Sequence, residues 1–294
     1  MRIGAKVPNS GQLPTTLGIG TMAAELERAG FDSLWVSDHV VMPGVVNSPY
    51  PFAADGKPTW PSDVPYFDAM IALAMIAAQT QHVLIGTAVL VLPQRNPVIL
   101  AKQAASIDVL SGGRLVLGIG AGWLAEEFDA LNVPFDTRGQ RFTEWVELLR
   151  RCWTGTPGAF DGQHYQLPAG ILAMPPPQHD IPLLVGGHSR VARSRAATIG
   201  NGWLAHQSAL ALDPAAIQHE IVQLRQAAKG TGKDPDALWV AVRIIDSASR
   251  MDVLAAVMPR LVEVGVDEVI VDTDWAVPGS AAAAHEQLRD AALR

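Results

Sequence analysis

The sequence predicts an α/β fold, a closed (β/α)8 TIM barrel formed as one domain by residues 1–294. Three observations favour this fold. Short apolar runs alternate with longer amphipathic runs along the whole chain, eight such pairs follow one another, and the length is typical of the barrel. An open doubly wound sheet is the alternative, but its G-x-G-x-x-G cue is missing after the first strand, where Pro8-Asn-Ser-Gly11 stands instead.

The first half of the chain is predicted to hold four strands, each followed by a helix. The strands are expected at residues 3–7, 33–36, 83–89 and 115–119, and the helices at 17–29, 69–80, from 97 onward and at 137–152. Gly30 stops the first helix, and Asn96 before Pro97 is a natural N-cap. Thr137-Arg-Gly-Gln140 resembles a capping box, which predicts that Thr137 caps the fourth helix.

The second half repeats the same alternation. The strands are expected at residues 182–185, 203–205, 238–244 and 269–271, and the helices from Ser189, from Asp213-Pro214, at 250–263 and at 280–293. Because strands that alternate with helices form parallel sheets with right-handed crossovers, the carboxyl ends of all eight strands should share one face.

Two insertions interrupt the alternation, one after the second strand and one before the fifth. The first, residues 40–67, contains six prolines and several aromatic residues, which favours an ordered lid over a floppy linker. Its aromatic residues include Tyr50, Phe52, Trp60 and Tyr66. The second covers residues 154–181, where 160–167 should form a small hairpin around Asp161-Gly162.

Composition and charge exclude several classes of protein. Apolar residues make up 49% of the chain and charged residues 17%, and the net charge of −7 argues against a nucleic-acid partner. The single cysteine, Cys152, excludes a disulfide within the chain and fits a reducing cytoplasm. The N-terminus has no apolar signal segment, and apolar runs such as 69–78 are too short to span a membrane, so we expect a cytoplasmic protein.

Asp38 and His39 follow directly after the predicted second strand. This is the edge where parallel α/β proteins place their chemistry. An imidazole there can transfer protons near neutral pH. The alternative is a structural pair in which the carboxylate of Asp38 simply satisfies the imidazole of His39.

Two glycine-containing turns also lie at predicted strand ends. Gly186-Gly187 precedes a helix that starts at Ser189, and a helix N-terminus offers free N–H donors to an anion. Arg190, Arg193 and Arg195 follow, so the turn fits a phosphate cradle or an ordinary tight turn with solvated arginines. The loop from Gly118 to Gly122 fits either a backbone wall against a flat ring or a turn that needs glycine dihedrals.

Known hydrolase and nucleotide motifs are absent from the sequence. It contains no H-E-x-x-H, no G-x-S-x-G and no Walker loop. A metal hydrolase site could draw on Asp38, His39, His206 and Asp272, but no spacing supports it.

Taken together, four segments of the chain resemble the luciferase-like monooxygenase superfamily, and within it the coenzyme F420 (deazaflavin)-dependent oxidoreductases. The resemblance covers nearly the whole chain. Its most specific segments are residues 30–39 (GFDSLWVSDH), 85–97 (IGTAVLVLPQRNP), 110–123 (LSGGRLVLGIGAGW) and Gly186-Gly187.

The resemblance implies a role for each candidate residue. Asp38 would contact the deazaflavin ring, His39 would be the catalytic proton donor or shuttle, and Ala88-Val89 would form a non-prolyl cis peptide behind the ring. The other implied cofactor contacts are Ala121, Gly122 and Glu126 at the ring, and Gly186, Gly187, Ser189 and Arg190 at the phosphate.

Three positions depart from the sugar-phosphate dehydrogenase of this group. Trp123 stands in place of a catalytic glutamate, Glu126 in place of an asparagine that contacts the cofactor, and Val91 in place of a threonine. Sugar-phosphate activity is therefore not expected, and the second proton-handling residue is unassigned.

The leading hypothesis is an oxidoreductase that transfers a hydride between coenzyme F420 and a small organic substrate, with Trp60 and Trp123 as apolar walls of the substrate site. An FMN-dependent monooxygenase on the same barrel is the alternative, and a non-catalytic deazaflavin-binding protein is a third. The expected partner is a small-molecule substrate, without metal, nucleic acid or membrane, and the resemblance suggests a homodimer.

Overall fold

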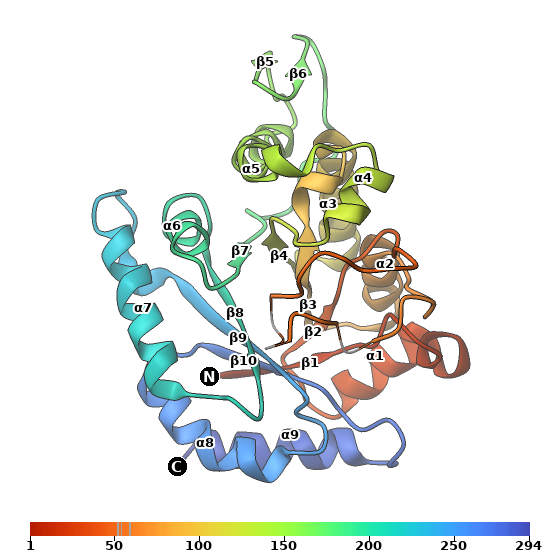
Figure 1. The fold of residues 1–294 in the computed structure, drawn as a ribbon, viewed down its shortest axis with the longest axis vertical. Coiled ribbons are helices and arrows are strands. Elements are labelled where there is room, and N and C mark those ends of the chain that lie inside the picture. The colour runs from red at the N-terminus through yellow and green to blue at the C-terminus, as the bar shows by residue number, and fades with distance from the viewer. Residues whose placement is uncertain (52, 54, 59) are drawn as a thin grey trace.

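The computed structural model describes residues 1–51, 53, 55–58 and 60–294. In this part of the chain, eight parallel strands close into a barrel in the order β1-β10-β9-β8-β7-β4-β3-β2 (Figure 1). The barrel strands are β1 (Arg2–Lys6), β2 (Ser33–Val36), β3 (Leu84–Val91), β4 (Leu115–Gly120), β7 (Leu183–Gly186), β8 (Gly202–Ser208), β9 (Trp239–Ile245) and β10 (Glu268–Val271). The predicted (β/α)8 barrel is confirmed.

Helices surround the barrel and fill the connections between its strands (Figure 1). They are α1 (Ile19–Arg28), α2 (Ala69–Gln79), α3 (Pro97–Ser111), α4 (Ala125–Ala130), α5 (Arg138–Trp153), α6 (Arg190–Thr198), α7 (Pro214–Ala228), α8 (Met251–Glu263) and α9 (Ser280–Ala292). Asn96 caps α3 through its side chain, as predicted, and Asp213 caps α7 in the same way. These caps satisfy backbone N–H groups that the helix itself leaves unpaired.

Two layers of apolar side chains hold the fold together. The larger lies between the helices and the outside of the barrel. The smaller fills the barrel itself and consists of Trp35, Val116, Leu184, Leu204, Ala241 and Ile270. Beneath it, the indole N–H of Trp35 donates to Ser33 and to the carboxyl of Glu268, both fully buried. The barrel interior is therefore a packed core below the site.

Some local predictions are wrong in instructive ways. The predicted capping box fails, because Thr137 ends a 3-10 turn (Phe135–Thr137), has φ −91° and ψ 0° rather than the extended angles usual for a cap, and makes no side-chain cap bond. The segment before α1 is a π-helical turn, Pro14–Gly18, so the regular helix starts later than predicted. β3 extends to Val91 rather than ending at residue 89.

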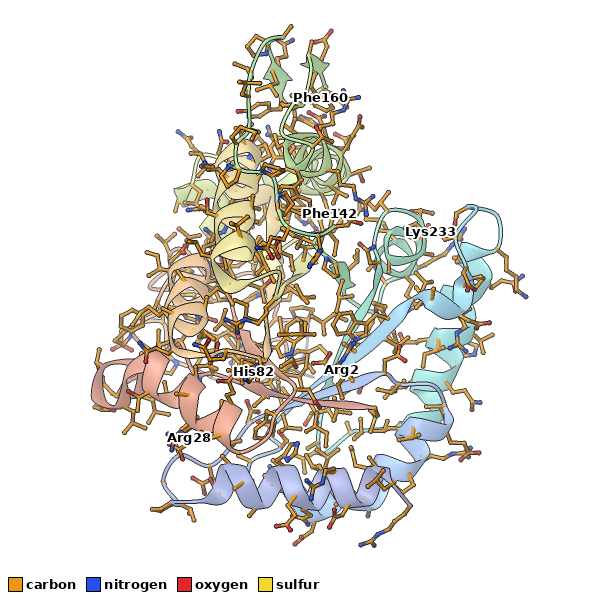
Figure 2. The ribbon with its side chains drawn as sticks, turned by 180° about the vertical axis from the view of Figure 1, so that it is seen from behind. Arg2, Arg28, His82, Phe142, Phe160 and Lys233 are labelled. Carbon is orange, nitrogen blue, oxygen red and sulfur yellow. The ribbon has the colours of Figure 1, made fainter. Side chains whose placement is uncertain are left out.

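The insertion before β7 forms the predicted hairpin, with β5 (Phe160–Asp161) antiparallel to β6 (Gln166–Leu167). Figure 1 shows this hairpin projecting beyond α5, and Figure 2 labels Phe160 in the part of the hairpin next to α5. The guanidinium of Arg151 on α5 lies 5.1 Å from the ring of Phe160. This insertion is thus attached to the outside of the barrel, away from the strand ends.

The insertion after β2 is held at both of its ends by Asn9, which is completely buried. The side-chain amide of Asn9 donates to the carbonyls of Ser37 and Phe67, and its oxygen accepts from the N–H of Ser37. A backbone bridge between Ser10 and Tyr66 adds to this. Phe52, one of the predicted lid aromatics, lies outside the described residues.

A membrane-spanning segment would need a long apolar helix. None of the helices in the described residues is long and apolar enough to cross a membrane.

Candidate active site

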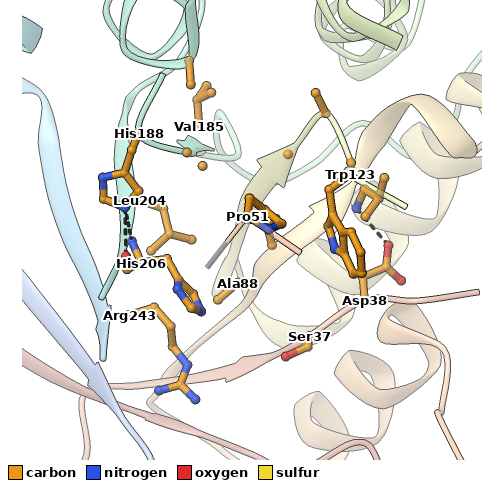
Figure 3. Close-up of a pocket in the computed structure, with 18 of the residues that line it drawn as sticks. Ser37, Asp38, Pro51, Ala88, Trp123, Val185, His188, Leu204, His206 and Arg243 are labelled. Carbon is orange, nitrogen blue, oxygen red and sulfur yellow. Dashed lines mark hydrogen bonds between the residues drawn. The ribbon is translucent and has the colours of Figure 1, made fainter. Parts of the chain in front are cut away.

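A cavity of about 530 Å³ opens at the carboxyl ends of the barrel strands (Figure 3). The predicted site residues that line it are Asp38, His39, Trp60, Ala88, Val89, Ala121, Gly122, Trp123, Gly186, Gly187 and Ser189. The structure therefore brings together residues from the ends of four strands, β2, β3, β4 and β7, and from the first insertion. Two predicted residues, Glu126 and Arg190, are not among the lining residues.

One wall of the cavity is the end of β3. The peptide bond between Ala88 and Val89 is cis, as the resemblance implied, and the pairing of β3 with β4 shifts register between Thr87 and Leu90. A Cβ added to Gly120 would lie 2.7 Å from one Cγ methyl of Val89, and a Cβ added to Gly186 would lie 2.6 Å from the other. Both distances are too short for two carbon atoms that are not bonded. Both glycines are therefore required by the side chain of Val89.

Asp38 is buried beside this wall, but it does not pair with His39. Its carboxylate accepts from the backbone N–H of Val91 at 2.9 Å and from the guanidinium of Arg95 at 2.5 Å. Burial raises the pKa of Asp38, and Arg95 opposes that shift. The hypothesis that Asp38 satisfies the imidazole of His39 is wrong, since its oxygens bind Arg95 and the end of β3.

The partner of His39 is Glu127 on α4. Nδ1 of His39 lies 3.0 Å from Oε2 of Glu127, whose other oxygen accepts from the backbone N–H of Val40 at 2.6 Å. Burial acts to raise the pKa of Glu127, but the bonds from His39 and Val40 outweigh it, so the pKa is lowered and the carboxylate stays ionised. The sequence analysis gave Glu127 no role, and only the fold reveals this pairing.

Glu126 has a different task from the one predicted. Its carboxylate accepts from the backbone N–H groups of Asn47 and Ser48 and from the hydroxyl of Ser48. These bonds outweigh the small effect of burial and lower the pKa of Glu126 to about 2. Two consecutive glutamates of α4 thus hold the first insertion, one at its start and one near its middle.

Aromatic rings surround His39. Its ring centroid lies 5.3 Å from that of Tyr66, 6.2 Å from that of Trp123 and 6.3 Å from that of Trp60. Tyr50 packs edge-on against both tryptophans, each with centroids 5.1 Å apart. Burial raises the pKa of Tyr50 to about 12 and also raises the pKa of Tyr66, so both phenols are neutral. Sequence analysis named both tyrosines only as lid aromatics.

The opposite end of the cavity carries the turn Gly186-Gly187-His188-Ser189, predicted as a possible phosphate cradle and called the anion turn below. Gly187 has φ +115°, a conformation that favours glycine, and Ser189 caps α6 by accepting from the N–H of Ala192. Arg190 is exposed and outside the cavity, whereas Arg195 lines it and donates to the carbonyl of Gly139. Arg195, rather than the predicted Arg190, is the arginine at this end.

Two further histidines lie nearby, His188 in the turn after β7 and His206 on β8 (Figure 3). A bond with Glu220 raises the pKa of His188, although burial opposes it. Burial lowers the pKa of His206 to about 3, and neighbouring Arg243 adds to this, so the ring of His206 is neutral at physiological pH. Arg243 lines the cavity and is paired with Asp272. Across the described ranges, no three His, Cys, Asp or Glu side chains gather to hold a metal ion.

Comparison with known proteins places this geometry in a family. A family model described as luciferase-like monooxygenase matches residues 5–292. The chain belongs to this family. An uncharacterised protein of Mycobacterium tuberculosis is 33% identical over 212 residues, which is 72% of each chain. An F420-dependent glucose-6-phosphate dehydrogenase of Amycolatopsis mediterranei is 29% identical over 186 residues, 62% of this luciferase-like chain and 51% of that enzyme.

Solved structures share the fold of this luciferase-like protein. An F420-dependent secondary alcohol dehydrogenase, in complex with an F420–acetone adduct, aligns with a TM-score of 0.77 and 18% identity over 99% of this chain and 98% of that one. A long-chain alkane monooxygenase aligns with a TM-score of 0.73 and 16% identity over 98% and 90%. At these identities the likeness shows the barrel fold alone.

Proposed function

We propose that the protein is an oxidoreductase that uses coenzyme F420 to oxidise or reduce a small, uncharged organic substrate. The observation that carries this proposal is the position of His39, which lines a cavity between the wall at Ala88-Val89 and the anion turn at Gly187. Relatives named as F420-dependent dehydrogenases support an oxidoreductase and favour the deazaflavin over other cofactors.

The residues at both ends of the cavity fit this cofactor. The wall formed by Ala88, Val89 and the loop at Gly122 has small side chains and exposed backbone, as a flat ring needs. The free N–H groups at the start of α6, which follows Gly187, together with the cation of Arg195, suit a phosphate. We propose that these groups hold the ring and the phosphate, respectively.

The cofactor, when bound, supplies hydride transfer at C5 of its ring. The protein must orient the substrate and handle the proton that accompanies the hydride. His39 does this at Nε2, because Nδ1 is bonded to Glu127. His206 is unsuited to this role, because a pKa of about 3 means that its ring does not take up an additional proton near neutral pH.

The substrate site is the part of the cavity around His39. Its walls are the rings of Tyr50, Trp60, Tyr66 and Trp123. These four rings present apolar surface and neutral phenols, and Arg243, which also lines the cavity, is already paired with Asp272. An anionic group such as a sugar phosphate would therefore lose its hydration without gaining an uncommitted cation beside these rings. An uncharged, largely apolar substrate fits better.

Titration with each cofactor tests the proposal. Dialysed protein is mixed with coenzyme F420 or with FMN, and binding is followed by the change in cofactor fluorescence. We expect tight binding of the deazaflavin. Tight binding of FMN with none of coenzyme F420 would overturn the proposal in favour of an FMN-dependent monooxygenase; two solved neighbours are named as monooxygenases.

A further inference from the structure

The carboxylate of Glu127 serves two sets of donors at once. Oε1 accepts from the backbone N–H of Val40 at 2.6 Å and of Val41 at 3.3 Å, while Oε2 lies 3.0 Å from Nδ1 of His39. The side chain of Glu127 is only 1% exposed, so water cannot replace these donors. Because an ionised carboxylate can only accept hydrogen bonds, Nδ1 of His39 must carry a proton.

We propose that Glu127 is a positioning residue that fixes the tautomer of His39 and makes Nε2 the basic atom presented to the cavity. This inference rests on the proposed function and names the missing partner of its proton-handling residue. No hydrogen bond to Nε2 is formed by any described residue, and the neighbours of the ring are the aromatic side chains of Tyr66, Trp60 and Trp123. Nε2 is therefore available to a substrate.

The arrangement accounts for the proton in a substrate oxidation. The O–H bond of a substrate hydroxyl breaks as an N–H bond forms at Nε2, and the electron pair of the adjacent C–H bond leaves as the hydride that the proposed cofactor accepts. The imidazolium that results keeps its Nδ1–H bonded to the anion of Glu127, which stabilises the positive charge. In reduction the same atom returns the proton.

Glu127→Gln gives a sharp test, because it should invert the tautomer rather than only loosen the ring. The N–H groups of Val40 and Val41 both need the remaining oxygen at the Oε1 position. The new NH2 group then faces Nδ1 of His39, which must become an acceptor. The proton therefore moves to Nε2, and the ring loses its basic atom on the cavity side.

The tautomer is measured by NMR of protein labelled with ¹⁵N-histidine and free of cofactor. The chain has 8 histidines, and the signals of His39 are those lost in a His39→Gln spectrum. We expect a protonated Nδ1 in the neutral ring of the wild type and a protonated Nε2 in Glu127→Gln. The matched control is Glu126→Gln, which removes the adjacent charge but contacts Asn47 and Ser48 instead, and should leave the tautomer unchanged.

Two results would overturn the inference. A protonated Nε2 in the wild type does so even if the Glu127→Gln variant fails to fold, and so does an unchanged tautomer in the folded variant. With coenzyme F420 and substrate, Glu127→Gln should lower kcat on the order of 10²-fold while cofactor affinity stays within a few-fold. If the wild type binds no deazaflavin, the proposed function fails while the tautomer result still stands.

Discussion

His39 is the residue on which the proposed chemistry depends. Replacing His39 by Ala removes the proton acceptor but leaves the wall at Ala88-Val89 and the anion turn at Gly187 in place. We expect turnover to fall by about 10²- to 10⁴-fold while affinity for coenzyme F420 changes only a few-fold. Steady-state kinetics and fluorescence titration measure the two effects. Unchanged turnover would mean that His39 has no part in proton transfer.

Val89 makes a second prediction at the scale of single residues. In Gly186→Ala the new Cβ would meet Cγ1 of Val89 at 2.6 Å, so Val89 must move toward the ring site. Overpacking of this kind typically costs about 1–3 kcal/mol, so we expect cofactor affinity to fall on the order of ten-fold. Adding Val89→Ala should restore it, because the colliding methyl groups are gone.

The double-mutant cycle is read from fluorescence titrations of the four proteins. If Gly186→Ala and Val89→Ala weaken binding additively, the contact between Val89 and Gly186 does not shape the ring site.

The sequence alone identified many of the cavity residues but not their partners. Residues 38 and 39 and the glycine turns were found because a strand end and its turn are local patterns. Glu127 escaped because it is 88 positions away from His39, and nothing local distinguishes it from Glu126. Arg190 was chosen for its place at the start of α6, whereas Arg195, one turn later, lies against α5 and reaches the cavity.

At the scale of elements, the insertion after β2 shows what composition can and cannot predict. Its prolines and aromatic residues predicted an ordered lid, and three of its described aromatic residues, Tyr50, Trp60 and Tyr66, line the cavity. They could not indicate that Asn9 ties its two ends or that α4 binds its interior, because those bonds join segments far apart in the sequence. The failed capping box at Thr137 has a similar cause, since a preceding 3-10 turn takes up the position of the cap.

At the scale of the whole molecule, the fold was predictable because alternation along the chain is repeated eight times, so an error in one element leaves the pattern intact. Polar side chains inside the barrel follow no repeated pattern in the sequence, so they could not be predicted in this way. Glu268 lies fully buried under the core with Ser33 and Trp35, and nothing in the sequence singled it out.

Glu268 makes the stability of the molecule depend on pH. Burial raises its pKa to about 7, although bonds from Ser33 and Trp35 oppose this. The unfolded carboxyl has an ordinary pKa, so the folded chain retains the proton longer, and stability falls as pH rises from about 4.5 through 7. Glu268→Gln stays neutral and keeps an acceptor oxygen. Relative to wild type, the variant should gain on the order of 3 kcal/mol between pH 5 and pH 8.

Urea unfolding of both proteins at pH 5 and pH 8 measures this difference. Comparing the two proteins isolates Glu268 from other groups that titrate, among them Lys6, whose pKa is lowered by burial to about 7. Parallel pH profiles for wild type and Glu268→Gln would show that Glu268 is not the source of the dependence.

The two-glutamate attachment of the first insertion has a consequence for how this barrel could diversify. Three of the aromatic side chains around the imidazole, Tyr50, Trp60 and Tyr66, come from one continuous stretch of chain, fixed to the scaffold by Asn9, Glu126 and Glu127. Because these three residues of the scaffold hold the segment through their side chains, another sequence that kept the same attachments would place different side chains around His39. Grafting such a segment would change substrate selectivity, while the strands, the wall at Ala88-Val89 and the anion turn stay the same.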